Sequence, residues 1–233
     1  MPEPSAGILD RPVMETSLAV LDFETTGLYA GGDRVIEVAV VRLEPGRGPQ
    51  LALDTLVNPQ RPVAATYIHG ISDRDVIDAP TFREISGELV RALEGCVLAA
   101  YNAYFDMRFL DWEMRAAGLA DRPPFLCLMY LRPLLGLGRR CGLDQACRVH
   151  GIEHATAHTA ADDALAAARL WGSCVAAMID RRIRTFGDLA EWGRYKFTDS
   201  FMRPPLRLEH TLLTPLRTRL KPRARPSACP IRP

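Results

Sequence analysis

The sequence predicts an α/β domain in which a mixed five-stranded sheet is flanked by helices. Two observations carry this prediction. In residues 18–57, three apolar and β-branched segments are separated by short turns, which indicates an antiparallel meander. After Gly95, short apolar segments alternate with segments of helical period, which favours parallel pairing of the later strands. A chain of 233 residues, 48% of them hydrophobic, is long enough for one such domain and an appendage.

The individual elements follow from the period of the apolar residues. The expected strands are short apolar runs bounded by turn residues, at 18–23, 34–43, 51–57, 96–100 and 125–129. The expected helices have apolar residues at helical spacing and lie at 82–93, 106–117, 143–149 and 160–179. Thr81 and Glu84 match a capping box before the first helix, and Gly95 matches a stop signal after it. Residues 185–197 have room for one more helix.

Composition divides the chain into three parts. Residues 1–16 are rich in Pro, Glu and Ser, and we expect a loose lead-in there. Residues 17–180 form the predicted folded domain. Residues 181–233 form a Pro- and Arg-rich extension with 13 basic and 4 acidic residues, net +9, whereas the first 180 residues hold 16 and 24, net −8. We expect this extension to be extended, and partly disordered unless it packs on the domain or on a partner.

Several classes of protein are disfavoured by the composition. There is no apolar run of about 18 residues or more, so no membrane span is expected. The N-terminus lacks the basic start and apolar block of a signal peptide, which predicts a cytoplasmic protein. The six cysteines form no Cys-x-x-Cys pair, so we expect reduced, mostly buried thiols and no zinc site.

Two carboxylates stand at the end of the first apolar strand. Asp22 and Glu24 are separated by one residue, and alternation along a strand places their side chains on the same face. Adjacent carboxylates repel each other and cost stability unless they share a cation. A pair of solvated acids at a strand end is the alternative, because any Asp-x-Glu pattern is a weak signal by itself.

Two further acidic elements follow later in the chain. Asp106 lies where the predicted second helix begins, so helix capping is an alternative role for it. Asp163 lies in the first turns of the helix predicted to start near Ala160, with His158 on the loop before it. The alternatives are a charge that complements the helix dipole for Asp163 and a solvated loop residue for His158.

The three acidic elements together indicate a metal site much more specifically than any one of them alone. Asp22, Glu24, Asp106 and Asp163 form an all-oxygen donor set, which suits Mg²⁺ or Mn²⁺ rather than zinc. Two such ions, about 4 Å apart, stabilise both the attacking and the leaving oxygen of a phosphodiester in an in-line displacement. A neutral histidine nearby, His158, can take a proton from the attacking water.

These residues make residues 17–178 similar to the DEDDh branch of the DnaQ-like 3′–5′ exonucleases, which includes RNase T, oligoribonuclease and the epsilon subunit of bacterial DNA polymerase III. Asp22 and Glu24 match its first motif, Asp106 the second, and His158 with Asp163 the third. The resemblance implies a ribonuclease-H-like fold. It also implies that Asp22 bridges both ions, that Glu24 and Asp163 hold the ion that activates water, and that Asp106 helps to hold the other.

The resemblance also implies contacts with the substrate. The backbone amides of the loop after Glu24 would meet the 3′-hydroxyl, and Leu28 would wedge against the last base. The implied substrate-binding residues are Thr25, Thr26, Gly27, Leu28, His69, Asn102 and Phe105. We expect His69 to order its loop or contact substrate rather than to catalyse.

Two choices within the third motif rest on spacing. Asp162 and Asp163 point about 100° apart on a helix, and the family spacing of four residues between the histidine and the aspartate selects Asp163. The same spacing selects His158 over His154. His150 and His210 match no motif and are interpreted as structural.

The predicted function is therefore a metal-dependent 3′–5′ exonuclease that releases nucleoside monophosphates, with single-stranded DNA as the predicted substrate. An RNase T- or oligoribonuclease-like exoribonuclease is the alternative, because discrimination at the 2′-hydroxyl depends on side chains that the motifs do not specify. A second alternative is an accessory or proofreading subunit docked to a larger complex through residues 181–233. The leucines of that extension favour a protein partner: Leu212, Leu213, Leu216 and Leu220. The clamp-binding peptide that epsilon subunits usually carry after the third motif is not recognisable.

Overall fold

The fold is described from a computed structural model, which describes residues 7–119, 122–154, 158–193 and 195–207. The predicted mixed five-stranded sheet is confirmed, with strand order β3-β2-β1-β4-β5. Strands β1 (Leu18–Thr25), β2 (Val35–Leu43) and β3 (Gln50–Leu56) form the antiparallel meander. Strands β4 (Val97–Ala100) and β5 (Phe125–Cys127) continue the sheet in parallel from β1.

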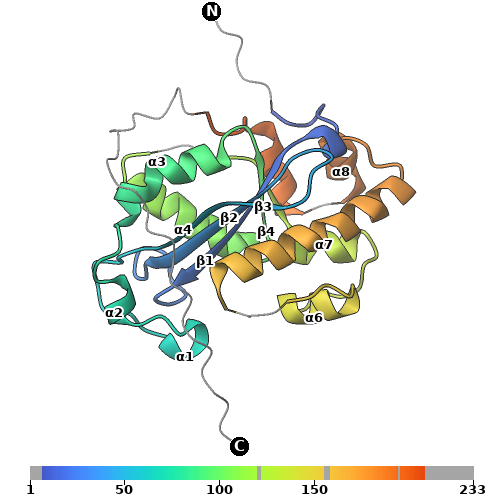
Figure 1. Cartoon of the computed structure of the whole chain (residues 1–233). Helices are drawn as coiled ribbons and strands as arrows, with labels where there is room; N and C mark the ends of the chain where they lie inside the picture. Colours follow the sequence, from blue (N-terminus) through green and yellow to red (C-terminus); the bar gives the residue numbers. More distant parts are fainter. Residues whose placement is uncertain (1–6, 120–121, 155–157, 194, 208–233) are drawn as a thin grey trace, which may run out of the picture.

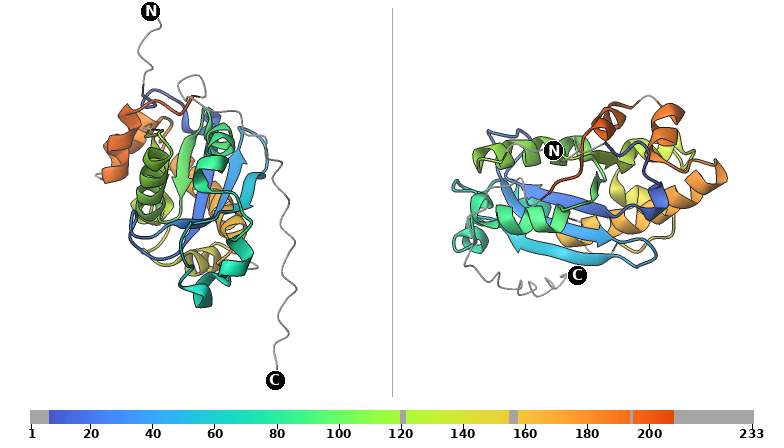
Figure 2. Two further views of the ribbon diagram at one scale, coloured as in Figure 1. Left: turned by 90° about the vertical axis from the view of Figure 1, so that its left-hand side faces the viewer. Right: turned by 90° about the horizontal axis from the view of Figure 1, so that it is seen from above.

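Helices cover both faces of the sheet (Figures 1 and 2). Helix α7 (Ala160–Asp180) crosses one face, where it packs against Leu18 and Val20 of β1. Helices α3 (Phe82–Leu93) and α4 (Ala103–Ala116) cover the other face, where Leu21 and Phe23 of the same strand are buried. Alternate side chains of β1 thus pack into two separate cores, one on each face of the sheet. Asp22 and Glu24 lie on the face toward α7.

Local sequence signals set the bounds of these helices. Helix α3 begins at the predicted capping box, where Thr81 and Glu84 satisfy each other's backbone N–H groups. Gly95 follows it with a φ of +75°, which L-residues with a side chain rarely adopt. Helix α7 approaches the sheet through buried alanines, including Ala164 and Ala167, whose small side chains allow close contact.

Shorter elements complete the fold. They are α1 (Thr66–His69), α2 (Asp73–Val76), α5 (Leu128–Leu134), α6 (Leu143–Val149), α8 (Phe186–Trp192) and the 3₁₀ turns η1 (Val13–Glu15) and η2 (Lys196–Met202). The expectation of a strand up to Met129 is wrong, because β5 ends at Cys127 and Leu128 already begins α5. A short apolar run does not distinguish a buried strand from the start of a buried helix.

The second predicted helix begins earlier than expected. Helix α4 starts at Ala103, and the Phe105 N–H donates to the Asn102 carbonyl at 2.8 Å. Asp106 is therefore not the capping residue but lies inside the first turn, close to the sheet. The capping role considered for Asp106 is wrong for this reason.

The first described residues contribute to the core together with residues 186–193 and 195–201. Residues 7–16, which the composition predicts to be loose, instead pack: Ile8 and Val13 are buried among Phe186, Phe197 and Phe201. The Ile8 N–H donates to the Phe201 carbonyl at 2.8 Å. The prediction from composition was wrong because the burial of two apolar side chains orders this segment although residues 1–16 are rich in Pro, Glu and Ser. Residues 1–6 and 208–233, with the leucine-rich part of the extension and His210, lie outside the described residues.

The basic extension begins as packed structure. Residues 181–193 and 195–207 include α8 and η2, and the Ser200 hydroxyl accepts a hydrogen bond from the Phe125 N–H of β5 at 2.9 Å. Leu206 is buried in the core below α3 and α4. The five cysteines among the described residues are free thiols, as expected. None of the helices in the described part of the chain has the length and apolar character that crossing a membrane requires.

Candidate active site

The end of β1 places carboxylates side by side on the face covered by α7. Asp22 and Glu24 alternate with the buried Leu21 and Phe23, as expected. In the register with β2, Glu24 lies opposite Glu37, so these two side chains share a face. Glu37 is 1% exposed and accepts a hydrogen bond from the Ala160 N–H at the start of α7. Glu37 was not among the predicted site residues, although a charged residue within the apolar run of β2 is a visible signal.

Helix α4 brings Asp106 to the same strand end. Asp106 is 4% exposed, and its carboxylate accepts a hydrogen bond from the backbone N–H of Phe23, the residue between Asp22 and Glu24. This hydrogen bond joins two residues that are 83 positions apart in the sequence (106 − 23). The early start of α4 makes this contact possible, because it turns the side chain of Asp106 toward β1.

Helix α7 contributes Asp163 from its first turn. The backbone N–H of His158 donates to the Asp163 carboxylate, and His158 itself has a φ of +67° and an exposed side chain. Possible ligand atoms of Glu24, His158 and Asp163 all lie within 4.8 Å of one another. Asp162 is not in this group and accepts a hydrogen bond from the Thr159 hydroxyl at 3.2 Å instead.

The four acids singled out by the motifs, Asp22, Glu24, Asp106 and Asp163, are called the carboxylate cluster below. Burial, followed by the charges of Asp106, Asp163, Glu24 and Glu37, raises the pKa of Asp22 well above its usual value. Burial and the charges of Asp163, Glu37 and Asp106 raise the pKa of Glu24 to about 8. The acids therefore act on one another electrostatically, which is the signature of a cluster that needs a cation to hold its full charge.

The other two members show the same pattern. Burial raises the pKa of Asp106 to about 7, against the hydrogen bonds from backbone N–H groups, and the charge of Asp163 adds to the rise. Burial also raises the pKa of Asp163, while the hydrogen bond and charge of His154 and the charge of His158 oppose that rise. Several oxygen donors and one imidazole within reach of each other fit a hard divalent cation.

His154, which the motif spacing set aside, contacts the cluster directly. Its Nε2 lies 2.5 Å from Oδ1 of Asp163, and its Nδ1 lies 2.5 Å from Oδ1 of Asp144 in α6. The imidazole is only 6% exposed, so it is enclosed between these two carboxylates. The motif spacing selects His158 over His154, whereas the structure places both histidines beside Asp163.

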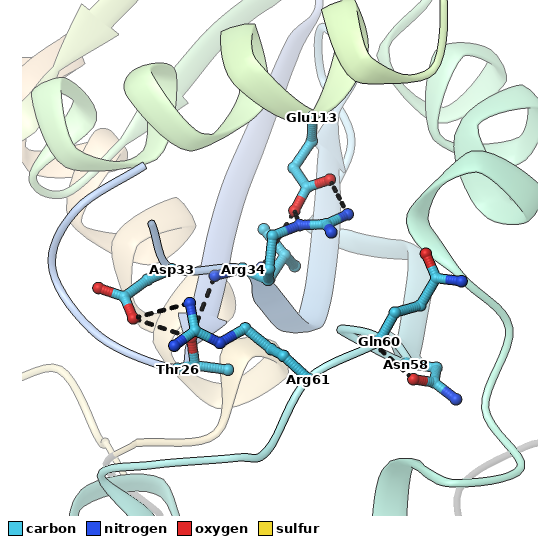
Figure 3. A network of polar contacts seen from close by, with 8 residues as sticks. Thr26, Asp33, Arg34, Asn58, Gln60, Arg61 and Glu113 are labelled. Carbon is cyan, nitrogen blue, oxygen red and sulfur yellow. Dashed lines mark hydrogen bonds and ion pairs between the residues drawn. The ribbon is translucent and has the colours of Figure 1, made fainter. Parts of the chain in front are cut away.

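The predicted substrate loop after β1 is held by Asp33 (Figure 3). Asp33 accepts hydrogen bonds from the Thr26 hydroxyl at 3.1 Å and the Tyr29 N–H at 3.0 Å, and Arg61 forms an ion pair with it at 3.6 Å. A Cβ at Gly27 would come within 2.4 Å of the Asp33 carboxylate, so any side chain there would require this carboxylate to move. Thr25 closes the turn by donating to the Gly27 carbonyl at 2.6 Å, and Leu28 remains 67% exposed beyond it.

A buried ion pair fixes the far end of the same loop (Figure 3). The guanidinium of Arg34 donates to both carboxylate oxygens of Glu113 on α4, each at 2.8 Å, and lies over the Trp112 ring at 4.8 Å. Glu113 is 1% exposed and also accepts from the Val35 N–H at 3.3 Å. The loop is thus attached to the helix that carries Asp106.

The remaining predicted substrate residues differ in exposure and in their local contacts. His69 is 7% exposed; its Nε2 faces the Ala64 carbonyl at 3.1 Å and its Nδ1 accepts from the Ile71 N–H at 3.1 Å. Both ring nitrogens are engaged by their own loop, so His69 orders that loop. Asn102 is exposed at the start of α4, and Phe105 packs against Phe109 with ring centroids 4.9 Å apart.

A mixed sheet with a carboxylate cluster at the end of its central strand defines a ribonuclease-H-like nuclease. Residues 19–171 match the RNase T family model, described as an exonuclease. The chain is also 33% identical over 189 residues to a "DNA polymerase III subunit epsilon-like protein" of Rhodobacter capsulatus. That alignment covers 78% of this chain but 27% of the relative, so the chain corresponds to about a quarter of that protein's length.

Solved structures show the same fold at lower identity. Exonuclease X, determined in complex with 5′-overhanging duplex DNA, has a TM-score of 0.52 and 23% identity, covering 79% of this chain and 99% of that one. The nuclease domain of 3′hExo, described as a DEDDh family member bound to rAMP, has a TM-score of 0.58 and 17% identity, covering 73% and 94%. The chain belongs to the DnaQ-like DEDDh family of 3′–5′ exonucleases, and the predicted family and fold are confirmed.

Proposed function

We propose that this protein hydrolyses the terminal phosphodiester bond at the 3′ end of single-stranded DNA and releases nucleoside monophosphates. The observation that carries the proposal is the carboxylate cluster, whose acids raise one another's pKa, with the His158 side chain beside it. Mg²⁺ or Mn²⁺, as two ions, is proposed to be held by Asp22, Glu24, Asp106 and Asp163. When bound, these ions supply electrostatic stabilisation of the attacking and leaving oxygens.

The protein's own residues supply position and proton transfer. His158 has an exposed side chain within reach of Glu24 and Asp163, where it can accept the proton of the attacking water. The loop from Thr25 to Leu28 is closed by its own hydrogen bonds and held by Asp33, so its backbone is preorganised for the terminal nucleotide. The exposed Leu28 is proposed to pack against the last base.

DNA is favoured as the substrate by two similarities. The relative from Rhodobacter capsulatus is named after a DNA polymerase subunit, and the solved structure of exonuclease X contains DNA. The 3′hExo domain bound to rAMP keeps an exoribonuclease as the second candidate. A panel of DNA and RNA strands of matched sequence distinguishes the two, because only acceptance of the 2′-hydroxyl differs.

A role within a larger complex is a further proposal, supported by the name of the same relative. The docking segment would be residues 181–233, of which 181–207 are packed on the domain. Deletion of residues 208–233 should leave the hydrolysis of free strands unchanged if these residues only dock a partner. If they bind phosphates, affinity falls for all strands alike and depends less on salt.

The activity test uses single-stranded DNA labelled at its 3′ end, with Mg²⁺ or Mn²⁺. The intact protein should release labelled mononucleotide. Asp22→Ala should abolish release, and His158→Ala should reduce the rate by about 10²–10⁴-fold. Asp162→Asn is the matched control for Asp163→Asn, because the two acids are adjacent but only Asp163 belongs to the cluster. Full activity of Asp22→Ala or His158→Ala would overturn the proposal.

A further inference from the structure

The environment of His154 differs from that of every other histidine in the described part of the chain. Each of its ring nitrogens lies 2.5 Å from a carboxylate oxygen, one from Asp144 and one from Asp163. Its side chain is 6% exposed, compared with 52% for Asp144 and 16% for Asp163. The imidazole is therefore buried between an outer carboxylate at the surface and an inner carboxylate of the cluster.

This arrangement constrains the inner carboxylate. The contact with Nε2 engages Oδ1 of Asp163, and the backbone N–H of His158 adds a second hydrogen bond to the same carboxylate. With one oxygen held, rotation about the bond that carries the carboxylate is restricted, so the direction of the other oxygen is set. Without the imidazole, an aspartate on the first turn of a helix has several side-chain rotamers available.

The outer contact holds the imidazole itself. His154 lies in the connection between α6 and α7, which has no helix or strand of its own at this residue. Asp144 lies in the first turn of α6, which packs against α7, and its contact with Nδ1 fixes the ring plane. The order of contacts is thus helix α6, Asp144, His154, Asp163 and helix α7.

We propose that His154, held by Asp144, is a positioning residue that orients the Asp163 carboxylate toward a divalent cation in the cluster. The proposal rests on the proposed function, because it assumes that Asp163 is a ligand. The two histidines then have different roles. His158 is exposed to solvent beside the cluster, whereas His154 is enclosed by its two carboxylates and positions Asp163. Partners of metal ligands that do not touch the ion typically change its affinity by about 10–100-fold.

The test measures Mn²⁺ binding to the full chain without nucleic acid, by electron paramagnetic resonance or calorimetry. His154→Ala should weaken Mn²⁺ binding by about tenfold or more. Asp144→Ala should weaken it less, because the imidazole remains but is no longer held. His154→Gln should be intermediate, since its amide retains a donor toward Asp163. Glu153→Gln, an exposed neighbour outside these contacts, should bind Mn²⁺ as the unaltered protein does.

Exonuclease activity provides a second readout. In His154→Ala the rate at low Mn²⁺ should fall, and excess Mn²⁺ should restore most of it, which a general loss of folding would not allow. Asp22→Asn separates the two proposals. If Asp22→Asn weakens Mn²⁺ binding but His154→Ala leaves it unchanged or tightens it, the positioning role is overturned while the proposed function stands. If the unaltered protein binds no Mn²⁺, the proposed function is overturned and the positioning role with it.

Discussion

The metal-free protein should lose stability as the pH rises from about 4.5 to about 8, and a divalent cation should reverse the loss. The cause is the carboxylate cluster, in which burial and neighbouring acids raise the pKa of Glu24 from 4.5 to about 8. Because the folded-state pKa is above the unfolded one, the folded state binds the proton more tightly. That contribution is fully present below the unfolded pKa and is lost as the pH passes through the folded pKa.

The size of the effect follows from the pKa of Glu24. A rise from 4.5 to about 8 corresponds to at most about 5 kcal/mol, at about 1.4 kcal/mol per pH unit. Glu24 is partly exposed, and solvent screening reduces this to about 2–3 kcal/mol. Asp22 and Asp106 shift in the same direction, so they add to the slope rather than cancel it.

The assay is urea unfolding at several pH values between 4.5 and 8.5, with EDTA or with Mn²⁺. The free energy of unfolding with EDTA should fall by at least the contribution of Glu24, about 2–3 kcal/mol, across this range. Mn²⁺ should stabilise the protein far more at pH 8 than at pH 5. Glu24→Gln should flatten the slope with EDTA, because the substituted amide does not titrate. A metal-free stability that is constant or increases up to pH 8 would refute the electrostatic reasoning.

Two further predictions concern the loop after β1. Arg34→Met should lower the free energy of unfolding by about 3 kcal/mol, because it leaves the buried Glu113 carboxylate unpaired. In urea unfolding, the double variant Arg34→Met, Glu113→Gln should recover part of that loss. Losses of the two single variants that add up strictly in the double variant would contradict this. In steady-state kinetics, Gly27→Ala should raise KM for single-stranded DNA about tenfold, because the new Cβ displaces Asp33. Gly32→Ala is the control: a Cβ at this position has its nearest contact at 3.5 Å, so KM should be unchanged.

The sequence was most informative where function and local pattern coincide. Apolar and β-branched segments separated by short turns predicted the meander, and the switch to alternating strands and helices predicted parallel pairing; the strand pairing confirms both. The motif residues Glu24, His158 and Asp163 come together as ligand atoms within 4.8 Å. Asp22 and Asp106 are placed beside them by strand alternation and by the bond from Phe23.

The parts that could not be predicted depend on contacts between distant residues. Glu37 meets the start of α7 across 123 positions of sequence, and no local pattern encodes that contact. The motif spacing treats His154 and His158 as alternatives, because it considers only the residues of the third motif. The contact between His154 and Asp144 was not predictable from that spacing, because Asp144 lies on another helix. Likewise, the composition of the N-terminal residues predicted a loose segment, although Ile8 and Val13 are buried in the core.

The contact between η2 and β5 has a consequence for solubility. β5 is the last strand of the sheet, and an outermost strand offers unpaired backbone groups to other molecules. Here the Ser200 hydroxyl occupies the Phe125 N–H, and Phe197 and Phe201 pack beside it. Residues 196–202 therefore cover the β5 edge of the sheet at Phe125 and oppose intermolecular strand pairing there. A version of the protein trimmed to the family motifs would lose this cover and expose β5 as an edge strand that can pair with other molecules.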